Sequence, residues 1–185
     1  MSEGPRARWG WHQLSDEWAR RLVDGAKIRP GDLVIDIGAG GGALTEPLVD
    51  AGARVLAVEL HPRRAQLLRD RFADADVRVL QVDAAELRLP DRPFQVVANP
   101  PFSITTALLR RLLHPRSQLR RADLVVPRHV ATRWAAGRGT DARRWSRRFT
   151  AEQAARVPAT AFTPPPPAPA AVLRLQRRAT RGRGV

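Results

Sequence analysis

The 185-residue chain contains no cysteine and only one lysine, Lys27. Without cysteine, disulfide bonds and thiolate metal sites are excluded. The four histidines show no metal-ligand spacing, so packing or surface positions explain them better. No apolar run approaches the ~20 residues of a membrane span, and the N-terminus lacks the apolar core of a signal peptide. These absences predict a soluble, cytoplasmic protein that binds neither metal nor membrane.

Acidic residues are also few, because 18 of them stand against 32 basic residues, which gives a formal net charge of +14. A GC-rich genome enriches arginine, but it does not by itself unbalance acids against bases. Arginine binds phosphates in a bidentate manner and stacks on bases, and each phosphate contact releases counterions. We therefore expect a nucleic-acid partner. The arginine pairs are its candidate contacts as a set: 110–111, 120–121, 143–144, 147–148 and 177–178.

The length is sufficient for one domain, which we place at residues 1–176, with a basic N-terminal segment and a helix first and a disordered basic tail at 177–185. Strands are expected at 33–37, 54–60, 77–82, 94–98 and 122–126, and helices from Ser15, at 43–51, 62–72 and 105–114. This alternation predicts a doubly wound α/β sheet with right-handed crossovers. Residues 156–162 and 170–175 are expected to close it as a strand pair, joined by the extended loop 163–169. Trp134 and Trp145 are expected to pack inside.

The apolar strand 94–98 leads into Asn99-Pro100-Pro101-Phe102. Neither proline can donate to a strand ladder, so the strand ends there, at the edge where open α/β sheets bind ligands. The Asn99 side chain and the Pro100 carbonyl are then fixed acceptors beside the aromatic face of Phe102. A nucleobase with an exocyclic amine suits this arrangement.

Gly38, Gly40 and Ala43 fit the G-x-G-x-x-A dinucleotide fingerprint, with Glu59 at the position of a ribose-binding acid. On its own this pattern is also compatible with NAD. Asp36, two residues before Gly38, suits a ligand with an ammonium group and would repel a pyrophosphate.

A further acid, Asp83, ends the third strand and is placed to accept a hydrogen bond from an adenine amine. Turn formation or capping would explain this residue or Asp36 alone. Acids and amides that end four successive strands favour S-adenosylmethionine as the cofactor.

Together, these motifs and the later Phe162-Thr-Pro-Pro segment resemble the rRNA adenine N6-methyltransferases, which include the erythromycin-resistance (Erm) methylases and the dimethyladenosine transferases. The resemblance runs from about His12 to Leu175. It implies a Rossmann-like, class I S-adenosylmethionine-dependent methyltransferase with a mostly parallel seven-stranded sheet. It further implies cofactor contacts at Gly38, Glu59, Asp83 and Asn99.

Trp11-His12-Gln13-Leu14 stands in place of the family's Gln-Asn-Phe-Leu, so the resemblance adds His12 and Leu14 as cofactor contacts. Phe102 stands where tyrosine is more common, a change that preserves stacking. In the implied reaction the target adenine is flipped out and held by Phe102, with Phe162 on its other face. Asn99 and Pro100 accept hydrogen bonds from N6, which then attacks the sulfonium methyl group.

The chain resembles the short Erm-type proteins that lack a C-terminal helical domain, so we expect a monomer that methylates an adenine of naked or assembling 23S rRNA. Such methylation gives resistance of the macrolide-lincosamide-streptogramin type. Alternatives are a 16S rRNA adenine dimethyltransferase of ribosome biogenesis, a DNA adenine or protein glutamine methyltransferase, and a non-catalytic RNA-binding factor. An NAD-dependent oxidoreductase ranks last, because nothing after Phe102 resembles a hydride-transfer site.

Overall fold

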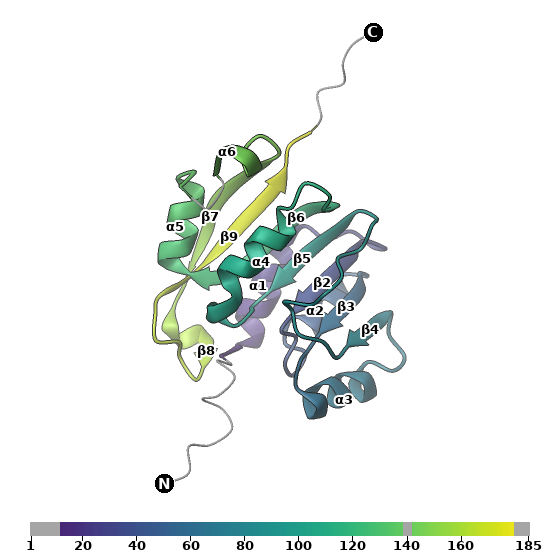
Figure 1. Cartoon of the computed structure of the whole chain (residues 1–185). Helices are drawn as coiled ribbons and strands as arrows, with labels where there is room; N and C mark the ends of the chain where they lie inside the picture. Colours follow the sequence, from purple (N-terminus) through teal and green to yellow (C-terminus); the bar gives the residue numbers. More distant parts are fainter. Residues whose placement is uncertain (1–11, 139–141, 180–185) are drawn as a thin grey trace.

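The computed structural model describes residues 12–138 and 142–179. The expected basic segment before His12 and the end of the expected tail, 180–185, lie outside the described residues. A seven-stranded sheet forms the centre of the molecule in the order β4-β3-β2-β5-β6-β9-β7 (Figure 1). Its strands are β2 (Leu33–Ile37), β3 (Arg54–Val58), β4 (Val77–Leu80), β5 (Phe94–Ala98), β6 (Leu119–Pro127), β7 (Phe149–Val157) and β9 (Ala170–Arg177).

The first five strands in that order run parallel, whereas β9 is antiparallel to both β6 and β7. The predicted α/β fold with a mostly parallel seven-stranded sheet is confirmed. The five strands expected between residues 33 and 126 match in place, and β2 and β5 match in both bounds. Strands buried on both faces carry the continuous apolar runs that make them recognisable in a sequence.

Helices cover both faces of this sheet (Figure 1). One buried cluster joins one face of the sheet to the helices that follow β5 and β6, and a second joins the opposite face to the earlier helices. The helices are α1 (Asp16–Ala26), α2 (Thr45–Asp50), α3 (Pro62–Arg71), α4 (Thr105–Leu112), α5 (Arg128–Ala135) and α6 (Ala142–Trp145). Trp134 and Trp145 stack at 5.1 Å between ring centroids, both buried, so the expectation that they pack inside is confirmed.

The closing strand pair differs from the prediction, because β7 spans Phe149–Val157 rather than 156–162. Pro158 follows this strand and opens a 3₁₀ turn at Ala159–Ala161, where a strand ladder cannot continue. Strand β7 lies at the sheet edge and is rich in alanine and charged or amide residues, a composition with weak strand propensity. The two-residue strand β8 (Phe162–Thr163) comes next, and it pairs with β1 (Gln13–Leu14).

Several arginines serve the fold rather than a polyanion. Arg111, expected among the phosphate contacts, donates to the carbonyls of Ala85 and Leu87. Arg177, assigned by the sequence to a disordered tail, is the last residue of β9 and donates to the Leu119 and Ser117 carbonyls at 2.6 Å each. The ordered chain therefore extends beyond the expected domain boundary at 176.

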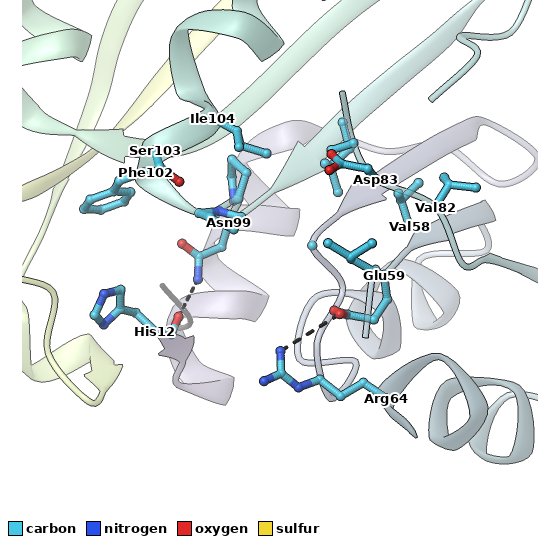
Figure 2. A pocket seen from close by; sticks show the side chains of 16 residues that line it. His12, Val58, Glu59, Arg64, Val82, Asp83, Asn99, Phe102, Ser103 and Ile104 are labelled. Carbon is cyan, nitrogen blue, oxygen red and sulfur yellow. Dashed lines mark hydrogen bonds and ion pairs between the residues drawn. The ribbon is translucent and has the colours of Figure 1, made fainter. Parts of the chain in front are cut away.

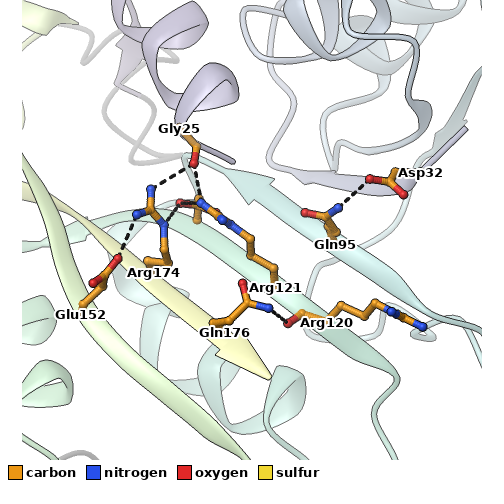
Figure 3. Close-up of polar contacts among 9 residues, drawn as sticks. Gly25, Asp32, Gln95, Arg120, Arg121, Glu152, Arg174 and Gln176 are labelled. Carbon is orange, nitrogen blue, oxygen red and sulfur yellow. Dashed lines mark hydrogen bonds and ion pairs between the residues drawn. The ribbon is translucent and has the colours of Figure 1, made fainter. Parts of the chain in front are cut away.

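A buried ionic cluster fastens α1 to the sheet (Figure 3). The carboxylate of Asp123 on β6 is fully buried, and it accepts from Arg121 at 2.6 Å and from Arg174 at 2.8 Å. Both guanidinium groups also donate to the carbonyl of Gly25 in α1, and Arg174 reaches Glu152 on β7 at 2.8 Å. One acid therefore organises contacts among four elements.

We expect Asp123→Asn to lower the free energy of unfolding by about 3–5 kcal/mol, because two partly buried arginines lose their counter-charge. Asp76→Asn is the matched control, since it breaks an ion pair whose side chains are 50% and 69% exposed. The control should cost less than about 1 kcal/mol. Urea unfolding measures both variants, and equal losses would contradict the role of the cluster.

Candidate active site

The carboxyl ends of four neighbouring strands surround a cavity of about 460 Å³ (Figure 2). Gly38 follows β2, Glu59 follows β3, Asp83 lies three residues beyond β4, and Asn99 follows β5. The sequence predicted this convergence, because parallel strands end at one edge of the sheet. The remaining lining residues are His12, Ile37, Val58, Leu60, Arg64, Val82, Ala84, Pro100, Pro101, Phe102, Ser103 and Ile104.

The side chain of Asn99 has one defined orientation. Its Nδ2 donates to the backbone carbonyl of His12 at 2.8 Å, and a carbonyl oxygen only accepts. One N–H of the amide is used in this bond, which fixes the orientation of the side chain and leaves Oδ1 as an acceptor in the lining of the cavity (Figure 2). The backbone of Pro100 follows directly, so two acceptors lie at this strand end, as the sequence predicted.

Two rings border the same part of the cavity. The centroid of Phe102 lies 6.3 Å from that of His12, with a 40° angle between the ring planes. His12 Nδ1 lies 2.9 Å from the carbonyl oxygen of Pro164. Because that oxygen can only accept, Nδ1 carries the proton, and Nε2 is the acceptor of the neutral ring.

Four expected site residues do not line the cavity: Leu14, Asp36, Gly40 and Phe162. Phe162 is 4% exposed and Leu14 is 2% exposed, and both belong to the hydrophobic core, paired across the β1–β8 ladder. The expectation that Phe162 covers the second face of the base is therefore wrong for this conformation, because its ring fills the core. The Phe162-Thr-Pro-Pro segment instead contributes the Pro164 carbonyl that holds His12.

Glu59 is held by the backbone of the glycine turn. Its Oε2 accepts from Gly40 N–H and its Oε1 from His61 N–H, each at 2.8 Å. A carboxylate oxygen has a second lone pair, so both oxygens retain an acceptor site at the cavity. Gly40 itself does not line the cavity; it orients Glu59. The turn passes Pro101 closely at Gly38, where φ is +79° and an added Cβ would lie 3.5 Å from Pro101 Cδ.

The carboxylate of Asp36 lies inside the protein rather than in the cavity lining, where the sequence had placed it. It is 1% exposed, its Oδ2 accepts from the Thr45 hydroxyl at 2.8 Å, and its Oδ1 has no hydrogen-bond partner within the described part of the chain. Burial raises the pKa of Asp36 to about 7; hydrogen bonding from Thr45 opposes the rise, and the charge of Glu59 adds to it.

Asp83 lies at the opposite wall of the cavity from Asn99 (Figure 2). Its Oδ1 accepts from the Ala85 N–H at 2.8 Å in a turn. The turn explanation for this acid is therefore confirmed, and the expected contact with a cofactor amine stays a prediction, since the second carboxylate oxygen can still accept.

Sequence reasoning missed Arg64 and the apolar walls. Arg64 Nη1 lies 4.0 Å from Glu59 Oε1, and the spacing of five residues between them was the available signal. Ile37, Val58 and Val82 lie at or just beyond strand ends and form apolar lining. The sequence analysis placed them only within strands, because a strand-end apolar residue looks the same in a sequence whether it packs against protein or against a ligand.

Within residues 12–138 and 142–179, no group of three or more histidine, aspartate or glutamate side chains has the arrangement of a metal site. Over the same residues, no helix has the length and apolar character needed to cross a membrane.

The pKa of Asp36 predicts a pH-dependent stability. Because the folded value of about 7 lies above the usual 3.8, the folded state retains a proton that the unfolded chain loses between these pH values. Stability therefore falls as pH rises from about 4 to 7, and it stays at the lower level above pH 7.

We expect Asp36→Asn to remove this decline, which is worth about 1–4 kcal/mol. Urea unfolding of both proteins from pH 5 to 8, without cofactor, measures the difference. Asp70→Asn on the surface of α3 is the control and should keep the wild-type profile. Parallel profiles for wild type and Asp36→Asn would refute the assignment.

Comparison with known proteins places this geometry in a family. Residues 6–183 match the ribosomal RNA adenine dimethylase family. The ribosomal RNA small subunit methyltransferase A of Synechococcus sp. (strain JA-3-3Ab) is 35% identical over 189 residues, covering 94% of this chain and 68% of the relative. The rRNA adenine N-6-methyltransferase of Corynebacterium diphtheriae is 37% identical over 159 residues, covering 84% and 62%.

Solved structures show a similar relationship. The 23S rRNA methyltransferase ErmE superimposes with a TM-score of 0.82 at 30% identity, covering 90% of this chain and 70% of that one. A dimethyladenosine transferase from Plasmodium falciparum gives 0.79 at 23% identity and shares the fold, covering 90% and 64%. The chain thus spans about two thirds of the length of these proteins. It belongs to the ribosomal RNA adenine dimethylase family, as an S-adenosylmethionine-dependent rRNA adenine methyltransferase.

Proposed function

We propose that this protein methylates N6 of an adenine in ribosomal RNA through the Asn99-Pro100-Pro101-Phe102 edge. The observation that carries the proposal is the orientation of Asn99. Its Nδ2 is bound to the His12 carbonyl, so Oδ1 remains as an acceptor next to the Pro100 carbonyl. Two neighbouring acceptors match the two N–H bonds of an adenine amino group, and they match no group that only accepts.

The residues at the other wall fit the cofactor. S-adenosylmethionine supplies an electrophilic methyl group on a sulfonium centre. Glu59 would bind its ribose hydroxyls through the two free lone pairs, and Asp83 would accept from its adenine amine. Apolar residues between them, Val58 and Val82, suit the flat face of a base. Gly38 leaves the backbone open to the methionine end.

Asn99 and Pro100 act on the nucleophile. The N6 lone pair of adenine is delocalised into the ring, which makes this nitrogen a poor nucleophile. Two hydrogen bonds accepted from N6–H favour a tetrahedral nitrogen whose lone pair is free to attack, and the N6 proton is then released to solvent. Because the acceptors are already oriented, they require no reorganisation during the reaction. The remaining rate enhancement comes from holding the N6 atom and the methyl group close together in the reactive orientation.

Phe102 and His12 would hold the base. Both rings border the cavity beside Asn99, and Phe102 is partly exposed, so its face is accessible for stacking. His12 would contact the second face of the target adenine, the position that the sequence analysis had assigned to Phe162. His12 would then bind the RNA base rather than the cofactor.

Small-subunit rRNA is the better supported target, because curated relatives with high coverage carry that name. This favours a 16S rRNA target over the 23S rRNA target that the sequence suggested first. Large-subunit rRNA is the second candidate, favoured by the similarity to the 23S rRNA methyltransferase ErmE. Macrolide resistance would result only from methylation of large-subunit rRNA. Either substrate places the enzyme in the cytoplasm, where bacterial ribosomes assemble.

The test is methyl transfer from radiolabelled S-adenosylmethionine to naked small-subunit and large-subunit rRNA, with the modified base mapped by primer extension. Label on small-subunit adenines supports the first target, and label on a large-subunit adenine supports the second. Absence of label in both RNAs, with the cofactor bound, would overturn the proposed function.

Asn99→Ala should reduce kcat by about 10²–10³-fold or more, because N6 loses a pre-oriented acceptor. Binding of RNA and of S-adenosylmethionine should persist. Gln95→Ala is the control, since this amide lies on the same strand and donates to Asp32 at 2.8 Å rather than facing the cavity (Figure 3). If Asn99→Ala abolished RNA binding instead, a catalytic role for this side chain would be wrong.

Phe102→Ala should raise the KM for RNA by the equivalent of about 1–3 kcal/mol, the usual value of one stacked base. Phe162→Ala should instead cost about 3–5 kcal/mol of folding stability, because its ring is buried in the core. Steady-state kinetics and urea unfolding separate the two effects. If Phe162→Ala raised the KM for RNA without lowering stability, Phe162 would stack on the target adenine after all.

A further inference from the structure

Positive charge is concentrated in the last third of the chain. Residues 124–185 contain thirteen arginines and two acidic residues, a net charge of +11 out of the total of +14. The described residues of this range include the end of β6 and the elements α5, α6, β7, β8 and β9. In Figure 1 this part lies at the end of the sheet opposite α3 and β4.

Four of these arginines gather at two adjoining hollows, which we call the arginine groove: Arg128, Arg133, Arg138 and Arg156. The hollows have volumes of about 850 and 490 Å³ and share Arg128 and Pro169 in their linings. All four side chains are exposed. Within the described residues, none of them forms an ion pair with a carboxylate, and no acidic side chain lines either hollow.

A proline-rich loop connects this groove to the catalytic cavity. At one end, the Pro164 carbonyl is bound by His12, which lines the cavity. At the other end, the Pro169 carbonyl accepts from the Arg128 N–H at 2.7 Å. Five steps of extended proline-rich chain span at most about 16 Å. Cavity and groove are therefore held at a short separation by a stiff segment anchored at both ends.

We infer that the arginine groove binds backbone phosphates of the RNA strand that carries the target adenine, a few nucleotides from the flipped base. The inference rests on the proposed function and adds the location of the strand. Among the described residues these guanidinium groups have no carboxylate partner, so they are available for phosphate, and the loop sets their spacing from Asn99.

RNA fits the groove better than an anionic membrane surface does. Membrane binding by a basic face combines charge with apolar side chains that insert. Among the described residues, the exposed large hydrophobic side chains are Leu60 and Leu67, on the other side of the cavity and on α3. The groove itself offers arginine, proline, His129 and Thr132, which suit phosphate and ribose.

The test compares two variants of the full chain that lose the same charge. Arg128→Ala/Arg156→Ala removes two guanidinium groups of the groove. Arg69→Ala/Arg78→Ala removes two exposed ones from α3 and β4. Methylation of an rRNA fragment is measured against RNA concentration and against salt, and S-adenosylmethionine binding is measured for each variant.

For the groove variant we expect the KM for the fragment to rise about tenfold, with kcat at saturating RNA and cofactor binding unchanged. The slope of log KM against log salt should fall by about 1.4–1.8, the value of two phosphate contacts. The control variant should keep the wild-type slope. A minimal RNA too short to reach the groove should be methylated equally by wild type and groove variant.

Equal loss in both double variants would overturn the inference, since it would indicate a general charge effect. So would a wild-type KM and slope in the groove variant. Both outcomes leave the proposed function intact as long as the wild-type protein methylates rRNA. Failure of the wild type to methylate any rRNA would instead remove the proposed function.

Discussion

The hydrogen bond from the Asn99 side chain to the His12 carbonyl is the contact on which the site depends. It joins the end of the central strand β5 to the start of the described chain, 87 residues earlier. It also determines which end of the amide is free for a substrate. An asparagine without this bond could rotate and present either its oxygen or its nitrogen to the substrate, and the preference for an amino group would be lost.

That contact needs His12 to be held in place, and two sets of interactions do so. Antiparallel pairing of β1 with β8 and the bond from His12 to Pro164 fix it from one side. On the other side, the helix that follows β1 is fastened to the sheet through Gly25 and the buried Asp123 cluster. A charged cluster that does not line the cavity therefore holds the helix that follows His12 and β1.

Arginine has at least two roles in this chain, and net charge does not distinguish them. Arg111, Arg121, Arg174 and Arg177 satisfy buried carbonyls or a buried carboxylate, since a guanidinium group offers five donors in a planar fork. The arginines of the groove make no ion pair with any described residue and lie exposed. Members of one adjacent pair can differ in environment: Arg120 is exposed whereas Arg121 binds Asp123, because neighbouring residues on a strand point to opposite faces.

The sequence by itself determined the sheet and the polar residues at its carboxyl edge. Apolar runs buried on both faces are legible without tertiary information, and parallel strands must end together, so Glu59, Asp83 and Asn99 were bound to meet. Only the tertiary structure decided which chemically suitable residues reach the cavity. Asp36 and Phe162 have the right chemistry, but packing enclosed both, whereas His12 and Arg64 were brought to the cavity by contacts with distant or neighbouring elements. Burial depends on the surroundings of a side chain in three dimensions, and a local pattern in the sequence does not contain them.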